Sequence, residues 1–327
     1  MKKNYVLNLI YVLFSCVYLK IFKKSLKNTN NTLINLYSKD NGKTLIFFHN
    51  IMKTKKVKKT KISSLIYEKN KPLISNEELV EKGYAKLSQN LKANHVKELI
   101  KVAKTLKCYN GEKFVFFDEK NITSTRYNYD SNDLVNQSFI QKLIMDEYLI
   151  DIAREYFNSE PIFDMPAMWW STPLGKGPSS QAAQLYHYDL DRVKWLKIFF
   201  YLTDVNDFNG PHQYIEKSHK INSKPLELLS KGYERISDDE IKNHYSIDSF
   251  KVIKGLMGSA FAADTLCWHK GAKLTEGNRL VLEMNYASSL LGTYSENLKV
   301  KNPTDSFKSF CKTNSTYTKN IKFEEFI

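Results

Sequence analysis

The segment QLYHYDLDRVKWLKIFFYLTDVNDFNGPHQY, residues 184–214, carries the first chemical signal in this chain. It starts with an alternating run, continues through the apolar run 193–202, and ends in a turn that contains Asn209-Gly210-Pro211. His187 and Asp189 are two residues apart, and on a strand such residues point to the same face. An imidazole and a carboxylate that converge in this way can supply two of the three ligands of a non-haem Fe(II) site. By itself, this spacing occurs often by chance and does not identify a metal site.

The chain around this segment is divided into short apolar or alternating runs separated by turn residues, which is typical of an all-β sandwich or barrel. From Pro161 onward these runs are 165–171, 184–189, 193–202, 213–215, 256–261, 265–269 and 279–286. Before Pro161, apolar residues at helical spacing predict helix in 76–107, interrupted at Gly83 by a short strand, and again over 137–157. Residues 222–250 are predicted to be an insertion that contains a helix.

The net charge of +14 belongs almost entirely to the N-terminal part of the chain. Residues 1–70 contain 15 of the 49 basic residues but two of the 35 acidic ones, so they carry +13. We therefore predict a basic N-terminal arm over residues 1–70 and one domain over residues 71–327. The lysine run 53–61 lacks arginine and the interleaved aromatic residues that base stacking uses, so we expect a solvated segment and no specific nucleic-acid partner.

Residues 5–19, YVLNLIYVLFSCVYL, form an apolar run with lysines on both sides. The run is shorter than the roughly 20 apolar residues that a spanning helix needs. As a helix it has one narrow polar stripe, formed by Asn4, Asn8, Tyr11, Ser15 and Tyr18. Two interpretations stay open: a helix in a membrane interface with its lysines on anionic headgroups, or a helix packed on the body of the protein. Residues 1–27 are therefore a candidate for peripheral membrane contact.

The four cysteines, Cys16, Cys108, Cys267 and Cys311, are far apart and form no CxxC pair. This spacing argues against a zinc ribbon and a disulfide framework, and it fits a reducing compartment. We therefore expect a cytoplasmic protein, with peripheral membrane attachment as the open addition.

A third iron ligand has to come from another strand. His269 ends the run 265–269, on or beside a strand, and ten residues later Arg279 begins the strand RLVLEMNY. A permanently charged guanidinium beside a metal is suited to a dicarboxylate, which it can hold through two hydrogen bonds. The other histidines are placed differently: His212 follows a turn, His219 lies in a loop, and His244 lies in the charged insertion.

Four motifs follow one another at plausible spacings, namely HxD (187–189), YLTDV…NGP…SH (201–219), DT…HKG (264–271) and NRL (278–280). Together they resemble the phytanoyl-CoA dioxygenase family, and the resemblance covers about residues 80–290. It implies an α+β chain whose core is a double-stranded β-helix, a jelly roll of the cupin type, with flanking N-terminal helices. It also implies that Asn209-Gly210-Pro211 and Ser218-His219 have structural roles.

On this resemblance, His187, Asp189 and His269 are the iron ligands and Arg279 binds the distal carboxylate of 2-oxoglutarate. Lys197 is either a further contact of the co-substrate or a solvent-facing residue of a mixed strand. The implied cofactor is Fe(II), with 2-oxoglutarate and O2 as co-substrates. The implied activity is that of a dioxygenase that hydroxylates a small molecule, of lipid or sugar type, and releases succinate and CO2. Related halogenases lack the carboxylate ligand, so Asp189 favours hydroxylation.

The sequence departs from the family pattern in one loop, which usually reads Pro-Gly-Ser-His and here reads Glu216-Lys217-Ser218-His219. We expect its backbone to differ. We expect the substrate pocket to be lined by residues 161–186, the 222–250 insertion and the C-terminal tail. Its aromatic surface is expected to come from Trp169, Trp170, Tyr186 and Tyr188. The alternative to an enzyme is a non-catalytic member of the same fold that acts as a membrane-associated binding or scaffold protein.

Overall fold

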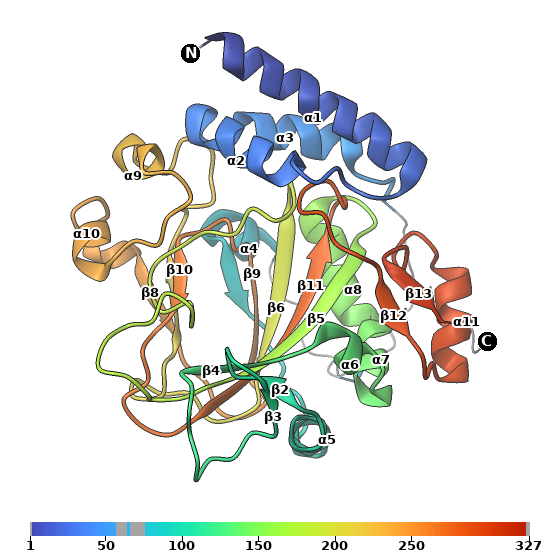
Figure 1. Cartoon of the computed structure of the whole chain (residues 1–327), viewed down its shortest axis with the longest axis vertical. Helices are drawn as coiled ribbons and strands as arrows, with labels where there is room; N and C mark the ends of the chain where they lie inside the picture. Colours follow the sequence, from blue (N-terminus) through green and yellow to red (C-terminus); the bar gives the residue numbers. More distant parts are fainter. Residues whose placement is uncertain (1, 57–63, 66–75, 325–327) are drawn as a thin grey trace.

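The computed structural model describes residues 2–56, 64–65 and 76–324 of the chain. Two antiparallel sheets form its centre, and helices cover the outside (Figure 1). The larger sheet has the order β1 (Tyr84–Lys86), β9 (Ala260–Ala263), β6 (Trp195–Tyr201), β11 (Arg279–Ala287), β5 (Ile162–Ser171), β4 (Arg126–Tyr129), β2 (Cys108–Tyr109), β3 (Phe114–Val115). The smaller sheet has the order β10 (His269–Gly271), β7 (His212–Ile215), β8 (Phe250–Ile253). This architecture confirms the predicted α+β fold with a double-stranded β-helix core.

The alternation of side chains along β11 separates two parts of the hydrophobic core. Val281 belongs to the cluster between the two sheets, where it is buried together with Phe199 of β6 and Tyr214 of β7. Leu280 and Leu282 belong to the cluster on the opposite face of the large sheet. The two-residue period predicted for residues 279–286 is therefore confirmed, and it directs Arg279 toward the space between the sheets.

Helices cover the outer face of the large sheet. They are α4 (Asn76–Lys82), α5 (Ala93–Thr105), α6 (Ser131–Val135), α7 (Ser138–Ile144), α8 (Glu147–Phe157) and α11 (Asp305–Thr313). The single helix predicted over 137–157 is wrong, because the chain breaks at Asp146. The Asp146 carboxylate accepts hydrogen bonds from the backbone N–H groups of Tyr148 and Leu149 and so caps the N-terminus of α8.

The N-terminal segment forms α1 (Lys2–Phe22), α2 (Thr29–Asp40) and α3 (Lys43–Met52), which lie together at one end of the molecule (Figure 1). Their buried side chains, such as Val12 and Phe48, share a cluster with Tyr188 and Trp268, the neighbours of the predicted iron ligands. These helices therefore pack against the body. The domain boundary predicted at residue 70, and residues 57–61 of the lysine run, lie outside the described residues.

Several predicted elements differ from the structure. Residues 184–189 form no strand of their own: isolated bridges join His187 to His269 of β10 and Tyr186 to Ile236 of the insertion. The insertion 222–250 contains α9 (Leu226–Ser230), α10 (Asp238–Lys242) and the 3-10 helix η1 (Ile247–Ser249), where one helix was predicted. The short strands β2, β3 and β4, and the parallel pair β12 (Leu298–Val300) and β13 (Ile321–Phe323), were not predicted. Strands of two to four residues are too short to show a period.

A buried ion pair ties the start of β5 to the segment that carries His187 and Asp189. Arg192 donates from Nε and Nη2 to the two carboxylate oxygens of Asp164, at 2.9 and 2.8 Å. Arg192 is 3% exposed and Asp164 is fully buried, so neither charge is compensated by water.

We expect Arg192→Met to lower the free energy of unfolding by about 3–5 kcal/mol, because it leaves the Asp164 carboxylate buried without its partner. Urea denaturation at neutral pH measures this. The matched control is Lys254→Met, which removes an exposed pair with Asp207 and should cost less than about 1 kcal/mol. Equal losses in the two variants would contradict the role given to the buried pair.

Lys224 is a buried lysine that joins the Ser218 loop to the segment before His269. Its ammonium group donates to the backbone carbonyls of Ser218 and Leu266 and lies 5.1 and 5.4 Å from the rings of Tyr188 and Trp268. Burial lowers its pKa to about 7. A neutral amine keeps two N–H groups, so it can still make both hydrogen bonds.

This lowered pKa predicts a pH-dependent stability. Above about pH 7 the unfolded chain binds a proton at Lys224 that the folded chain lacks, so this residue makes the unfolding free energy rise with pH. Relative to Lys224→Met, the wild-type protein should gain up to about 1.4 kcal/mol per pH unit between pH 7 and 9. Urea denaturation of both proteins across this range is the measurement. Parallel pH profiles would show that Lys224 stays charged in the folded protein.

Candidate active site

The two predicted histidine ligands are brought together by the backbone. His187 lies in the segment between β5 and β6 and exchanges two hydrogen bonds with His269, the first residue of β10, at 3.0 and 2.8 Å. Their imidazole rings are consequently side by side, with centroids 4.3 Å apart. The backbone N–H of Asp189 donates to the Thr265 carbonyl at 2.7 Å, which fixes the carboxylate on the same side. One ligand atom from each of His187, Asp189 and His269 lies within 4.8 Å of the others.

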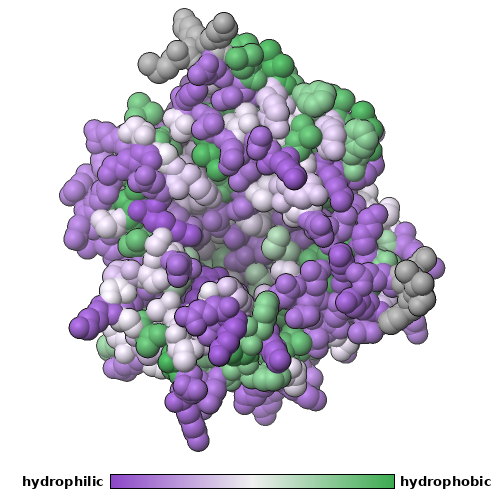
Figure 2. Space-filling view, in the orientation of Figure 1, coloured by the Kyte–Doolittle hydropathy of each residue, from purple (hydrophilic) through white to green (hydrophobic). Residues whose placement is uncertain are grey.

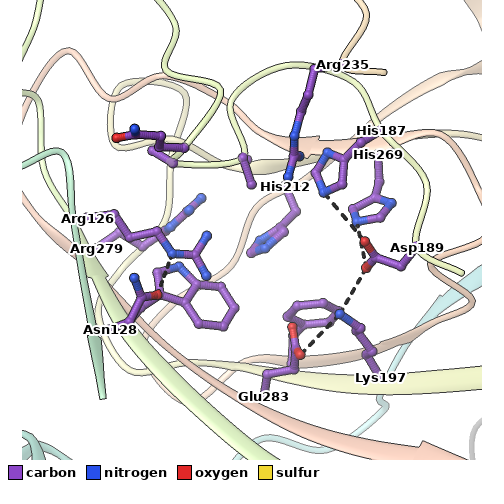
Figure 3. Close-up of a pocket in the computed structure, with 16 residues that line it drawn as sticks. Arg126, Asn128, His187, Asp189, Lys197, His212, Arg235, His269, Arg279 and Glu283 are labelled. Atoms are coloured by element: carbon purple, nitrogen blue, oxygen red, sulfur yellow. Dashed lines mark hydrogen bonds and ion pairs between the residues drawn. The ribbon is translucent and has the colours of Figure 1, made fainter. Parts of the chain in front are cut away.

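Backbone carbonyls determine which imidazole nitrogen faces the centre of this cluster. Nδ1 of His187 lies 2.9 Å from the Leu185 carbonyl, and Nδ1 of His269 lies 2.9 Å from the Cys267 carbonyl. A carbonyl only accepts, so in both rings Nδ1 carries the proton and Nε2 carries the free lone pair. The Nε2 atoms lie 3.9 Å and 3.5 Å from the two Asp189 oxygens (Figure 3).

The protonation states of these groups suit a metal ion. Burial lowers the pKa of His187 well below its ordinary value. Burial alone would raise the pKa of Asp189, but the positive charge of Lys197 outweighs it and helps to hold this pKa well below its usual range. A neutral imidazole and an ionised carboxylate are the forms that bind a divalent cation.

Lys197 projects from β6 toward the Asp189 carboxylate. Its Nζ lies 2.9 Å from Asp189 Oδ2 and 3.3 Å from Glu283 Oε1 on β11. Burial would lower the pKa of Lys197, but these two carboxylates keep it above its ordinary value. Lys197 is therefore an inward-facing, charged residue. A contact with 2-oxoglutarate remains a prediction for it.

Arg279 faces the other side of the same pocket (Figure 3). Its Nη2 lies 3.3 Å from Ser171 Oγ, while Nε and Nη1 are buried and have no hydrogen-bond partner among the described residues. Burial lowers its pKa to about 10. Gly271 leaves room for the guanidinium, since a Cβ there would lie 2.9 Å from Nη2. Buried N–H groups without partners are costly, so this arrangement fits a bound carboxylate.

A second arginine was not predicted from the sequence. Arg126 on β4 and Arg279 on β11 are both register partners of Ser171 on β5, so they flank the same residue. The Arg126 guanidinium lies 4.2 Å from the Trp169 ring, and its Nε donates to Asn128 at 2.8 Å. The alternation of Arg and Asn with Tyr in the RYNY segment was the only sequence signal for it.

These residues line one cavity of about 320 Å³. Its charged lining residues are Arg126, Asp189, Lys197, Arg235, Arg279 and Glu283. Of the expected aromatic residues, Trp169 lines the cavity. The expectation for Trp170 and Tyr186 is wrong: Trp170 stacks on Phe117, and Tyr186 is buried beside the bridge to Ile236. The C-terminal tail also contributes no lining residue among those described, because it forms β12, β13 and α11 beside the large sheet.

The three other histidines considered from the sequence, His212, His219 and His244, have other partners. His212 lines the cavity, and its Nδ1 lies 3.0 Å from the Tyr201 hydroxyl. That hydroxyl donates its proton to the Ile253 carbonyl, so His212 Nδ1 is the donor and Nε2 is an acceptor. His219 contacts the Val80 carbonyl at 3.0 Å, and His244 pairs with Glu227 at 3.6 Å.

The Ser218-His219 loop is built into the framework of the site. Ser218 Oγ accepts a hydrogen bond from the backbone N–H of Trp268 at 2.8 Å and donates to the Ile215 carbonyl at 2.7 Å. Lys217, at the position where the family has glycine, adopts a positive φ of 67°. The backbone at Lys217 is thus left-handed, a conformation that glycine adopts more readily than lysine. The expected difference from the family's loop remains a prediction.

Comparison with known proteins places these residues in a family. The model of the phytanoyl-CoA dioxygenase (PhyH) family matches residues 79–281, which is more than half of the chain. No curated protein gives a significant match.

Several solved structures are similar to this chain at low identity. HygX from Streptomyces hygroscopicus, with nickel and 2-oxoglutarate bound, is 15% identical, with a TM-score of 0.48, over 70% of this chain and 91% of that chain. EvdO2 from Micromonospora carbonacea var. aurantiaca, complexed with 2-oxoglutarate, is 14% identical, with a TM-score of 0.46, over 70% and 93% of the two chains. AviO1 from Streptomyces viridochromogenes Tue57 is 14% identical, with a TM-score of 0.45, over 68% and 96%.

These likenesses are too distant to assign a role to any residue, so the family assignment comes from the match over residues 79–281. The His-Asp-His cluster and the buried arginine fit that assignment. The chain therefore belongs to the phytanoyl-CoA dioxygenase family and is a 2-oxoglutarate-dependent non-haem iron oxygenase.

Proposed function

We propose that this enzyme hydroxylates a small polar molecule and that His187, Asp189 and His269 hold its iron. The observation that carries this proposal is the convergence of two Nε2 lone pairs on an ionised carboxylate. Bound Fe(II) would allow O2 to oxidise both 2-oxoglutarate and the substrate. One oxygen atom would enter succinate, the other would enter the new hydroxyl group, and CO2 would be released. The protein's own groups hold these reactants in position.

Arg279 is proposed to bind the distal carboxylate of 2-oxoglutarate. Its unpartnered Nε and Nη1 lie on two different edges of the guanidinium, so a carboxylate can pair with Nη1 and Nη2 on one edge or with Nε and Nη2 on the other. Lys197 is proposed to act mainly on Asp189, whose Oδ2 it already contacts at 2.9 Å. In that position it holds the carboxylate in one orientation and keeps it ionised.

The character of the cavity favours a polar substrate over an acyl chain. Charged residues surround it, including Arg126 and the exposed Arg235 (Figure 3). The indole of Trp169 is covered by the Arg126 guanidinium, so little apolar surface is left for a hydrocarbon. Of the two substrate types open from the sequence, these contacts support a sugar-type or similarly polar molecule.

We also propose a cytoplasmic location. All four cysteines are buried as free thiols, which a reducing compartment preserves.

Succinate formation tests the catalytic proposal. The protein is purified anaerobically and supplied with Fe(II), 2-oxoglutarate and a metabolite mixture from a lysate, and O2 is then admitted. We expect succinate, and we expect His187→Ala and Asp189→Ala to lower its rate by more than about 100-fold because each removes a metal ligand. His244→Ala is the matched control, since His244 pairs with Glu227 outside the cavity. Bound iron without succinate would favour the non-catalytic binding or scaffold protein.

Arg279 is tested through the dependence of the rate on 2-oxoglutarate. Arg279→Gln should raise the KM for 2-oxoglutarate by about 100-fold, because a charge-assisted pair of hydrogen bonds is worth about 3 kcal/mol. Arg279→Lys should recover part of this loss, since it restores the charge without the planar fork. An exposed lysine variant, Lys86→Gln, should leave the KM unchanged. An unaltered KM in Arg279→Gln would exclude this role.

A further inference from the structure

The N-terminal helix α1 exposes its apolar side chains on the side that faces away from the protein. These side chains are Val6, Leu7, Ile10, Leu13, Phe14, Val17, Ile21 and Phe22, each between 43% and 63% exposed. All but Phe22 fall on one stripe of the helix at a spacing of three or four residues. α1 is the outermost element at its end of the molecule (Figure 1), and hydrophobic side chains gather there beside the N-terminus (Figure 2).

The opposite side of α1 is tied to the body by polar groups as well as by apolar packing. Val12 and Cys16 are buried in the cluster of the N-terminal helices. Ser15, on the polar stripe predicted from the sequence, is fully buried, and its hydroxyl accepts a hydrogen bond from Thr29 at 3.0 Å. The Tyr5 hydroxyl donates to Asp40 at 2.9 Å. A surface helix of a soluble protein buries its apolar side and exposes its polar side, and α1 departs from that rule.

Positive charge gathers at the C-terminal end of the same helix. A cavity of about 780 Å³ is lined there by Lys20, Lys23, Lys24, Lys319 and Lys322, and its described lining residues include no carboxylate. Lysines that follow a helix also complement its dipole. That effect does not account for Lys319 and Lys322, which come from the turn before β13 and from β13 itself. The cluster therefore has a chemistry that suits several anionic groups at once.

We propose that the exposed apolar stripe of α1 and the lysines at its C-terminal end together bind a bilayer containing anionic lipid, with α1 lying in the plane of the interface. The exposed apolar side chains then enter the region between headgroups and acyl chains, and the five lysines contact the lipid phosphates. The charge complementarity between the lysine cavity and anionic headgroups identifies a lipid surface as the partner. This inference rests on α1 and its surroundings, independently of the proposed reaction.

The packing of α1 favours a helix that lies on the membrane over one that crosses it. By length and composition alone, α1 is apolar enough to span a bilayer. Crossing would pull it away from α2, expose the buried Leu33 and Leu36, and break the hydrogen bond between Ser15 and Thr29. Just beyond the helix, Ser25 donates to the Gly292 carbonyl at 2.8 Å, which holds the chain to the body.

Cosedimentation of the full-length protein with vesicles is the test. Vesicles of phosphatidylcholine mixed with phosphatidylglycerol are compared with vesicles of phosphatidylcholine alone, and binding is expected mainly to the former. The double variant Leu13→Gln, Phe14→Gln should lower the partition coefficient about ten-fold. The triple variant Lys20→Gln, Lys23→Gln, Lys24→Gln should lower it on the order of 100-fold and weaken its dependence on salt.

The control variants use exposed residues elsewhere on the protein. Ile247→Gln with Leu256→Gln removes apolar side chains that are 74% and 73% exposed, and Lys97→Gln, Lys101→Gln, Lys104→Gln removes three lysines from α5. Both controls should bind vesicles like the wild type. All variants alter surface residues, so their urea midpoints and succinate formation in solution should stay unchanged, and the membrane result is then separate from catalysis.

Three outcomes would overturn the proposal. The first is the absence of binding to either vesicle. The second is binding that the α1 variants and the controls affect equally. The third is a dimer in sedimentation equilibrium that the Leu13→Gln, Phe14→Gln variant dissociates while vesicle binding is absent, since the apolar face would then be covered by a second copy of the chain.

Discussion

The site depends on the two backbone hydrogen bonds between His187 and His269. β10 belongs to the small sheet through its pairing with β7, whereas the segment containing His187 leads into β6 of the large sheet. This contact therefore brings a ligand from the small sheet, His269, next to a ligand from the segment that precedes β6 of the large sheet, His187. It also sets the rings 4.3 Å apart, and the carbonyls of Leu185 and Cys267 then orient both Nε2 atoms inward. The backbone thus fixes both the distance between the two imidazole rings and the orientation of each ring.

The buried charges divide the pocket into two ends with different requirements. At one end Lys197 is paired with Asp189 and Glu283, so its charge is compensated within the protein. At the other end Arg279 keeps two buried nitrogen atoms unpaired among the described residues. Such an arrangement costs folding free energy, and a bound dicarboxylate would recover part of it. The unpartnered N–H groups of Arg279 thus destabilise the fold locally and are also the groups that can bind the ligand.

Charge has separate uses in the two parts of the chain. The N-terminal 70 residues carry +13, and described lysines from this part meet Lys319 and Lys322 around one cavity. The rest of the chain is nearly neutral, and Arg126, Lys197 and Arg279 from this part line the pocket. α1 links the two parts, because its buried side joins the cluster that contains Trp268, next to His269. The N-terminal helices thus pack against Tyr188 and Trp268, the chain neighbours of the three proposed iron ligands.

The ligand motif and several of the main strands could be read from the sequence, because each depends on a two-residue period or on local spacing. His187 and Asp189 are close in sequence, so their convergence needs little tertiary information. The choice of His269 over His212 was carried by resemblance, and its physical reason, the bridge to His187, exists only in the folded chain. Arg126 was missed since β4 is four residues long, and it reaches the pocket only through pairing with β5. The sequence likewise determined that α1 is apolar with one polar stripe. Only the tertiary structure decided which side of α1 is buried: Val12 and Cys16 pack on the body, and Ser15 is the buried member of the stripe, because Thr29 offers its hydroxyl a partner there.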